Sequence, residues 1–245
     1  MLKVNGTPGL YIVFEGIGGS GKDAQVALLA ARVQREMPGT KFIVTREPGG
    51  TEEGQRIRKR LLSDETLTSE DEVKLFIEDR VLNQERVVLP ALQEGSIVIQ
   101  NRSFVSNMAY QGHGKGLGIE RVLEANLAVV SKVPPDVIVF LDVGWEVGKG
   151  RFGKAENDKF DQETVNFWKR VETGYLQSVH RVVEVLPTKV LTIEDKTGGL
   201  NILDTHRKIW QGLEPHMDLL WRIREGLVTH SFLIEGVGRP HRERV

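Results

Sequence analysis

The chain has 245 residues, of which 40% are hydrophobic and 27% are charged, and this length suits one large domain with an appendage or two small domains. Lysine and arginine total 33 against 34 aspartate and glutamate residues, so the net charge of −1 provides no overall positive field for nucleic acid or an anionic membrane. The absence of cysteine excludes disulfides, thiolate nucleophiles and cysteine-ligated zinc. The sequence shows neither a secretory signal nor an apolar run of membrane-spanning length, and we therefore expect a cytoplasmic protein with no membrane or nucleic-acid partner.

Five short apolar segments alternate with longer segments of helical period. We expect strands at residues 10–14, 41–45, 96–100, 137–141 and 190–193, and helices at residues 21–36, 52–62, 70–92, 119–131 and 162–185. Strands that are almost continuously hydrophobic are typical of a parallel sheet covered on both faces. The alternation predicts an open, doubly wound α/β domain, in which ligands bind beyond the carboxyl ends of the strands.

The sequence changes character at about residue 198. We expect helices at about 202–213 and 216–224, followed by a solvated tail that ends in GRPHRERV. The predicted division is therefore a domain over residues 1–197 and a C-terminal helical extension and tail over residues 198–245.

A glycine-rich segment, GIGGSGK at residues 16–22, follows the first predicted strand. Gly16, Gly18 and Gly21 fit a dinucleotide-binding pattern, and Glu47 beyond the second strand would then be a candidate ribose ligand. Gly16, Gly21 and Lys22 fit the phosphate loop of kinases and nucleotide hydrolases instead. Lys22 favours the phosphate loop, because a lysine after the last glycine reaches the terminal phosphates of a triphosphate.

Asp23 stands where such loops place a serine or threonine whose hydroxyl binds Mg²⁺. A carboxylate is a good ligand for a hard cation, but it brings negative charge close to polyphosphate. An acidic residue in a first helical turn also interacts favourably with the helix dipole. Both interpretations of Asp23, metal ligand and dipole partner, stay open from the sequence.

Motifs after the later strands decide between the two patterns. They are TREPGGT at 45–51, LFIEDR at 75–80, NRS at 101–103, SNMAYQG at 106–112, LDV at 141–143 and DKFD at 158–161. In this order the series resembles the thymidylate kinases, which transfer the γ-phosphoryl group of ATP to dTMP. The resemblance covers about residues 10–195, and TREPGGT and AYQG are its specific parts. It implies a three-layer P-loop fold with a central five-stranded parallel sheet and helices on both faces, with Mg²⁺ as cofactor, ATP and dTMP as substrates, and a homodimer.

The resemblance also implies a role for individual residues. The ATP phosphates would be bound by Gly16, Gly18, Gly19, Ser20, Gly21, Lys22 and Asp23. The acceptor dTMP would be bound by Arg46, Pro48, Phe76, Arg80, Arg102, Ser106, Asn107, Tyr110 and Gln111. A mobile lid would span about residues 146–158, with Arg151 and Lys154 as its candidate cations. Lys22, Arg102 and Arg151 would be catalytic, because phosphoryl transfer needs positioning and positive charge around the transferred group.

Each of these assignments has a structural alternative. Phe76 on a helix is also a candidate core residue, and Arg102 a candidate ion-pair partner. Asn107 and Gln111 fit a cap or turn as well as a ligand, and Arg151 fits a solvated helix face.

Four positions depart from the family pattern at the predicted phosphate site. Gly18 and Asn101 replace acidic residues, Asp23 replaces serine or threonine, and Ser103 replaces an aromatic residue. We hypothesise that Asp23 assumes part of the metal-organising role lost at Asn101, with help from a neighbouring carboxylate at Glu15 or Asp142.

Three other functions remain as alternatives. They are a kinase for another deoxynucleoside monophosphate, a catalytically silent nucleotide-binding relative, and a dinucleotide-dependent oxidoreductase, which Lys22 and the later motifs disfavour.

Overall fold

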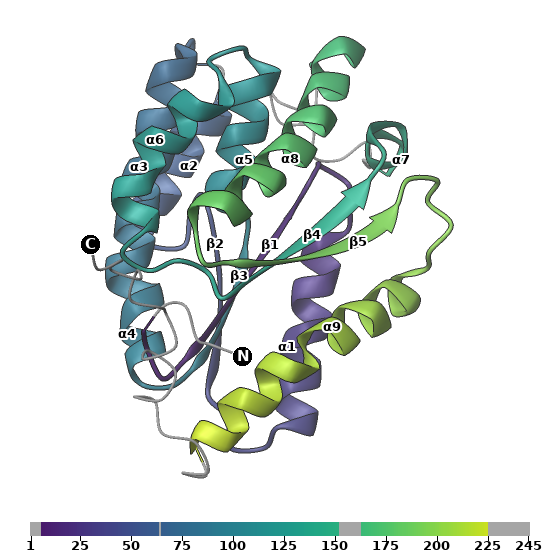
Figure 1. Ribbon diagram of the computed structural model, residues 1–245. Coiled ribbons are helices and arrows are strands. Elements are labelled where there is room, and N and C mark those ends of the chain that lie inside the picture. The colour runs from purple at the N-terminus through teal and green to yellow at the C-terminus, as the bar shows by residue number, and fades with distance from the viewer. Residues whose placement is uncertain (1–5, 64, 152–162, 225–245) are drawn as a thin grey trace, which may run out of the picture.

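The structure is a computed structural model that describes residues 6–63, 65–151 and 163–224, the side chains of the last four excepted. Five parallel strands form one sheet in the order β2-β3-β1-β4-β5 (Figure 1). The strands are β1 (Leu10–Gly16), β2 (Phe42–Arg46), β3 (Ile97–Asn101), β4 (Val137–Val143) and β5 (Lys189–Asp195). All five predicted strands, and the three-layer α/β class, are confirmed.

The strand registers bring the ends of β1, β2 and β3 together. Phe14 on β1 lies level with Asn101 on β3, which in turn lies level with Arg46 on β2. The glycine loop follows the middle strand, and the segments after β2 and β3 leave the sheet beside it. The predicted ligand motifs therefore meet at the carboxyl edge of the sheet, where doubly wound sheets bind ligands.

Helices cover both faces of the sheet. They are α1 (Lys22–Glu36), α2 (Glu52–Leu62), α3 (Ser69–Asn83), α4 (Leu89–Gln93), α5 (Phe104–Asn107), α6 (Ile119–Val130), α7 (Trp145–Gly150), α8 (Val165–Val185) and α9 (Ile202–Arg224), with two π-helical segments, η1 (Gln84–Val88) and η2 (Met108–Gly114). Threonine side chains cap three of the helices at residues 51, 68 and 164. None of these helices, within the described ranges, is long and apolar enough to cross a membrane.

Alternating residues of the strands contribute their side chains to two separate hydrophobic cores. Tyr11 and Val13 of β1 point into the larger core under α3, α5, α6 and α8. Ile12 and Phe14 point into the second core under α1 and α9, on the opposite face in Figure 1. This period-2 alternation, apolar on both sides, is what a parallel sheet buried between two helical layers requires.

Two helix predictions need correction. The helix expected at 70–92 is α3 followed by the π-helical segment η1 and then α4, because a π-turn is a local register change that apolar spacing does not reveal. The two helices expected at 202–213 and 216–224 are the single helix α9, with Pro215 inside it. Proline in a helix interior costs ~3 kcal/mol, and burial of Leu213, Met217 and Leu220 around it opposes that cost.

Helix α9 contacts α1, β1 and β5 and contributes Ile209 and Leu213, both fully buried, to the second core. The first part of the predicted extension therefore shares its core with the sheet. The division of the chain at residues 197 and 198 stays a prediction.

Candidate active site

The glycine loop between β1 and α1 has a backbone that only glycine accommodates. Gly16, Gly19 and Gly21 have φ angles of 147°, 71° and 91°, in the region that favours glycine. A Cβ at Gly16 would lie 2.6 Å from the carbonyl oxygen of Leu141, and one at Gly19 would overlap the carbonyl of Gly148 in α7. The loop is therefore packed closely between β4 and α7. Because Gly21 has no side chain to cap α1, the first N–H groups of this helix are available to a ligand such as phosphate.

Lys22 folds back across this loop. Its Nζ donates hydrogen bonds to Gly16 O at 2.8 Å, to Ile17 O at 2.7 Å and to Ser20 Oγ at 3.1 Å. Burial, together with the positive charge of Arg102, lowers the pKa of the Lys22 amine well below its ordinary value. The three hydrogen bonds thus hold the Lys22 amine at the centre of the loop, close to Arg102.

Arg102 reaches the same loop from the end of β3. Its φ of 66° is unusual for a residue with a side chain, and such strain is characteristic of functional sites. Nη1 donates to Gly16 O at 3.3 Å, to Ser106 Oγ at 3.1 Å and to Tyr175 OH at 3.0 Å, while the guanidinium lies 5.6 Å from the centre of the Tyr110 ring. Tyr110 OH itself accepts from the N–H of Gly18 in the loop, at 3.2 Å.

Glu15 anchors the segment that carries Arg102. The side chain is fully buried, and its Oε1 accepts from Ser103 N at 2.7 Å and from Ser106 N at 3.3 Å, while Oε2 accepts from Ser106 Oγ at 2.6 Å. Burial raises the pKa of Glu15 above its ordinary value. Both oxygens of Glu15 are engaged in this anchor, and Asp142, the other carboxylate considered beside Asp23, forms an ion pair with Lys196 at 2.6 Å.

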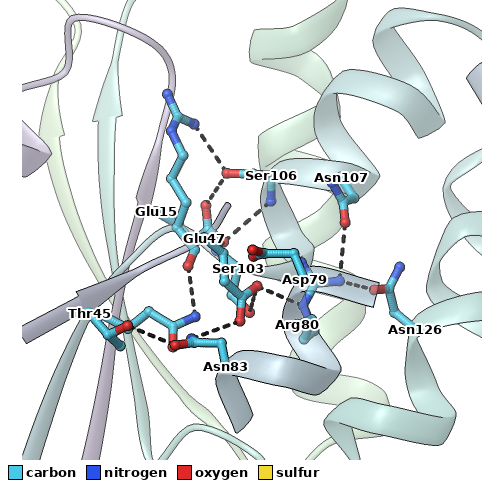
Figure 2. A network of polar contacts seen from close by, with 12 residues as sticks. Glu15, Thr45, Glu47, Asp79, Arg80, Asn83, Ser103, Ser106, Asn107 and Asn126 are labelled. Carbon is cyan, nitrogen blue, oxygen red and sulfur yellow. Dashed lines mark hydrogen bonds and ion pairs between the residues drawn. The ribbon is translucent and has the colours of Figure 1, made fainter. Parts of the chain in front are cut away.

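Arg80 lies fully buried in a polar network (Figure 2). Its Nε donates to Glu47 Oε2 at 2.8 Å, and its Nη1 donates to Asn107 Oδ1 at 3.1 Å and to Asn126 Oδ1. Its Nη2 finds no partner among the described residues. Because buried donors are nearly always hydrogen-bonded, this unpaired N–H group marks a position where a ligand oxygen would be favoured.

The loop after β2, TREPGGT, is held against α3. Glu47 is buried and also accepts from Asn83 Nδ2 at 3.3 Å and Ser103 Oγ at 3.3 Å (Figure 2). Gly49 N donates to Asp79 Oδ1 at 2.9 Å. Burial and the negative charge of Glu47 raise the pKa of Asp79 to about 7. Pro48 is buried within this loop.

Arg46, Asp23 and Asn101 line one open groove of about 530 Å³. Asn101 Nδ2 donates to Asp23 Oδ1 at 2.7 Å, and Asn101 Oδ1 is buried without a partner in the described part of the chain. Two of the four positions that depart from the expected family pattern, 23 and 101, are therefore in direct contact. Arg46 is exposed at the end of β2.

Phe76 is half-buried and packs against a small cluster formed by Ile57, Leu61 and Leu75. This packing fits the alternative role of Phe76 as a core residue. The stacking of Phe76 on a base stays a prediction. Gln111 is buried in η2, and its Nε2 donates to Glu72 Oε2 at 3.2 Å.

Arg151 follows α7 and forms an ion pair with Asp195 at 3.2 Å. Both residues line a cavity of about 310 Å³, together with Ser20, Gly21, Leu200 and Ile202. The cavity is thus continuous with the glycine loop. Lys154 and most of the predicted lid, residues 152–158, lie outside the described residues.

Known proteins match this chain over most of its length. Residues 14–195 match the family model described as thymidylate kinase. The chain is 36% identical over 202 residues to the thymidylate kinase of Kosmotoga olearia, covering 82% of this chain and 93% of that protein. It is 35% identical over 208 residues to the thymidylate kinase of a Synechococcus species, covering 85% and 97%.

The chain belongs to the thymidylate kinase family. A crystal structure of thymidylate kinase from Ehrlichia chaffeensis superposes with a TM-score of 0.67 at 29% identity, and the alignment covers 84% of this chain and 98% of that one. The resemblance drawn from TREPGGT and AYQG is thereby confirmed.

The structure buries polar residues to which sequence reasoning gave no role. Glu72, Asp79 and Asn83 of α3 and Asn126 of α6 are buried around Arg80 and the loop after β2. One signal was present, because residues 72, 79, 80 and 83 share a helical face and are polar where an amphipathic helix would be apolar.

Proposed function

We propose that this member of the thymidylate kinase family transfers the γ-phosphoryl group of ATP to dTMP, giving ADP and dTDP. The observation that carries the proposal is the convergence of two cations, one at the start of α1 and one directly after β3, on one loop carbonyl. Lys22 Nζ lies 2.8 Å and Arg102 Nη1 lies 3.3 Å from Gly16 O. Two polyanions must approach each other in this reaction, and fixed positive charge between them offsets their repulsion.

The donor phosphates would lie on the glycine loop. Backbone N–H groups of the loop and of the first turn of α1 would bind the phosphate oxygens, and Lys22 would turn from the loop carbonyls to the β- and γ-phosphates. The adjoining cavity, lined by Arg151 and Leu200, would hold the nucleoside of ATP. Arg151 would supply further positive charge from the lid side.

The acceptor would lie between α3, η2 and the loop after β2. The unpaired Nη2 of Arg80 would donate to an oxygen of the thymine ring, beside Asn107 and Gln111, with Phe76 against the base and Tyr110 beneath the deoxyribose. Arg46, Pro48, Arg102 and Ser106 would surround the monophosphate. An oxygen of this phosphate attacks the γ-phosphorus as the bond to the bridging oxygen of ADP breaks, and no covalent enzyme intermediate is needed.

Asp23 would be the protein ligand of a Mg²⁺ ion in the groove that it lines with Arg46 and Asn101. A carboxylate oxygen suits this hard cation, and Asn101 Nδ2 holds the carboxylate in place through its hydrogen bond to Oδ1. No group of three or more His, Cys, Asp or Glu that could hold a metal occurs in the described ranges, so the remaining ligands would be phosphate oxygens and water. When bound, Mg²⁺ neutralises charge that develops on the transferred and leaving phosphate oxygens. The family resemblance further supports a cytoplasmic homodimer, which light scattering of the purified protein would test.

A coupled ADP-release assay tests the proposed reaction. ATP, Mg²⁺ and each of dTMP, dUMP, dCMP, dGMP and dAMP are supplied in turn, and turnover is expected to be fastest with dTMP. The variant Lys22→Met should lower kcat by a factor on the order of 10²–10³, the cost of removing one preorganised charge from a transition state. Lys132→Met, at an exposed position after α6, is the control. Binding of ATP and dTMP without ADP release would instead identify a silent relative.

A further inference from the structure

A tyrosine of α8, outside every motif of the sequence, contacts the candidate site through its hydroxyl group. Tyr175 is only 1% exposed. Its ring stacks on Phe140 of β4, with the ring centres 5.8 Å apart, and meets the Tyr110 ring edge to face at 6.0 Å. Its hydroxyl oxygen lies 3.0 Å from Arg102 Nη1 and 2.8 Å from Ser106 Oγ. The two aromatic neighbours therefore fix the ring, and the ring fixes the position of the hydroxyl group.

The hydrogen bonds of this hydroxyl group run in one direction. A guanidinium group can only donate, so the oxygen of Tyr175 accepts from Arg102. Ser106 Oγ donates its own proton to Glu15 Oε2 at 2.6 Å (Figure 2). The proton of Tyr175 is then left for Ser106 Oγ. The chain of hydrogen bonds thus starts at the guanidinium, passes through two hydroxyl groups and ends at the buried carboxylate.

Arg102 Nη1 has two further acceptors, and both lie farther away than Tyr175. Ser106 Oγ, at 3.1 Å, belongs to the segment that directly follows Arg102. Gly16 O, at 3.3 Å, also accepts from Lys22 Nζ. Tyr175 is therefore the nearest of the three acceptors, and it stands 73 positions away in the chain. Its hydroxyl group ties the end of the arginine side chain to α8.

A fixed guanidinium is what the proposed reaction requires at this position. A free arginine side chain samples many rotamers, and ordering it when substrate binds costs free energy that a preordered side chain avoids. Positive charge that is already in place stabilises the charge that develops during phosphoryl transfer. The backbone of Arg102 is constrained by its φ of 66°. The Tyr175 hydroxyl extends this constraint to the guanidinium.

We propose that Tyr175 is a positioning residue that holds the guanidinium of Arg102 in the orientation used for acceptor binding and phosphoryl transfer. The proposal deepens the proposed dTMP kinase activity and rests on it. Tyr175→Phe keeps the ring between its aromatic neighbours and removes only the hydroxyl group. Arg102 then loses its nearest acceptor while the other two remain, so we expect a partial loss of activity.

A double-mutant cycle in the full-length protein tests this role. Tyr175→Phe is expected to lower kcat/KM for dTMP about tenfold, which corresponds to the loss of one hydrogen bond to a charged group. In an Arg102→Met background there is no guanidinium to hold, so the same substitution should change kcat/KM by less than about twofold. Ser178→Ala is the control, because it removes from the same helix a buried hydroxyl group that has no partner among the described residues. It should leave kcat/KM unchanged.

Two results of the cycle would overturn the proposal. Equal losses from Tyr175→Phe in the two backgrounds would show a structural role that does not act through Arg102. An unchanged kcat/KM in the folded Tyr175→Phe variant would show that the hydroxyl group is not needed. Urea unfolding reports on the fold of each variant. If Tyr175→Phe does not fold, Tyr175→Met takes its place in the cycle, because methionine adapts to irregular space in a core.

The same cycle, measured as calorimetric Kd values for dTMP, needs no turnover. Because Arg102 is a predicted ligand of the acceptor phosphate, Tyr175→Phe should weaken dTMP binding in the wild-type background and have little effect in Arg102→Met. Equal effects in both backgrounds would again overturn the proposal. A wild-type protein that binds dTMP without transferring phosphate contradicts the proposed reaction, and the Kd values then still decide the role of Tyr175.

Discussion

Asn101 donates a hydrogen bond to Asp23 over 2.7 Å, although 78 positions separate the two residues in the chain. One stands at the end of β3 and the other in the first turn of α1. Each departs from the family pattern, because Asn101 has lost a carboxylate and Asp23 has gained one. The contact places the carboxylate gained at position 23 directly beside the position of the one lost at 101, within the groove that both residues line.

The first prediction is that the carboxylate of Asp23 supports Mg²⁺ binding and that a carboxylate at position 101 can replace it. Asp23→Asn should raise the Mg²⁺ concentration for half-maximal activity about tenfold, since it removes the one carboxylate of the pair. The exchange variant Asp23→Asn with Asn101→Asp should recover most of the loss. Binding of Mn²⁺ to the ATP complex, followed by electron paramagnetic resonance, measures the metal without turnover.

A control separates this metal effect from a general change in surface charge. Glu124→Gln, at an exposed position on α6, should leave Mg²⁺ dependence unchanged. If Asp23→Asn behaves like Glu124→Gln in both measurements, Asp23 serves the helix dipole and not the metal.

The second prediction concerns the contact between α7 and the glycine loop. A Cβ at Gly148 would lie 2.5 Å from Gly18 O, whereas one at Gly150 would meet nothing within 4 Å. Gly148→Ala should therefore displace α7 or the loop, lower stability by ~1–3 kcal/mol and weaken ATP binding. Gly150→Ala shares the gain in helix propensity without the overlap. Urea unfolding and calorimetric titration with ATP compare the two, and indistinguishable variants would contradict the packing argument.

The strands and the loop chemistry were predictable because their signals are local. Residues 137–141 are apolar without interruption, and the glycines at 16, 19 and 21 stand where the backbone needs positive φ. The π-turns were not predictable, since they depend on how α3 and η2 pack against their neighbours. Continuity of α9 through Pro215 likewise depends on the burial of Leu213 and Met217 against the sheet, which is a tertiary effect.

The candidate site likewise contains residues that the sequence predicts and residues that it does not. Lys22 and Arg102 were identified because their positions follow strands, and the sheet order then brings them together. The sequence gives Asn126 no motif, and it offers Glu15 only as a neighbouring carboxylate for Asp23. The roles of both residues follow from partners on distant segments, as in the hydrogen bonds of Glu15 to the backbone of Ser103 and Ser106, so the folded structure was needed to assign them.

The third prediction is a pH dependence from Asp79. Its pKa rises from an ordinary 3.8 to about 7 because the side chain is buried beside Glu47, with Arg80 and Arg58 opposing the rise. Between these values the folded protein binds more protons at Asp79 than the unfolded chain does, so this carboxyl makes stability fall as pH rises from about 4 to 7. The loss is on the order of 1–4 kcal/mol.

Asp79→Asn removes that titration and keeps an oxygen for the N–H of Gly49. Relative to the wild type, the variant should therefore gain stability between pH 5 and pH 8. Urea unfolding at pH 5, 6, 7 and 8 measures the difference, in which the titrations of other carboxylates largely cancel. A difference that stays constant across this range would show that Asp79 does not titrate there in the folded protein.

The fourth prediction tests whether helix α9 is an integral part of the domain or a separable extension. Leu213 is fully buried in the core under α1 and β5, whereas Leu203 on the same helix is 61% exposed. Leu213→Ala should lower the free energy of unfolding by ~2–5 kcal/mol, and Leu203→Ala should change it by less than about 0.5 kcal/mol. The two substitutions have the same effect on helix propensity, so their difference isolates burial. A large difference within one cooperative transition would make α9 an integral layer of the kinase domain, while two small effects would support residues 198–245 as a separable extension.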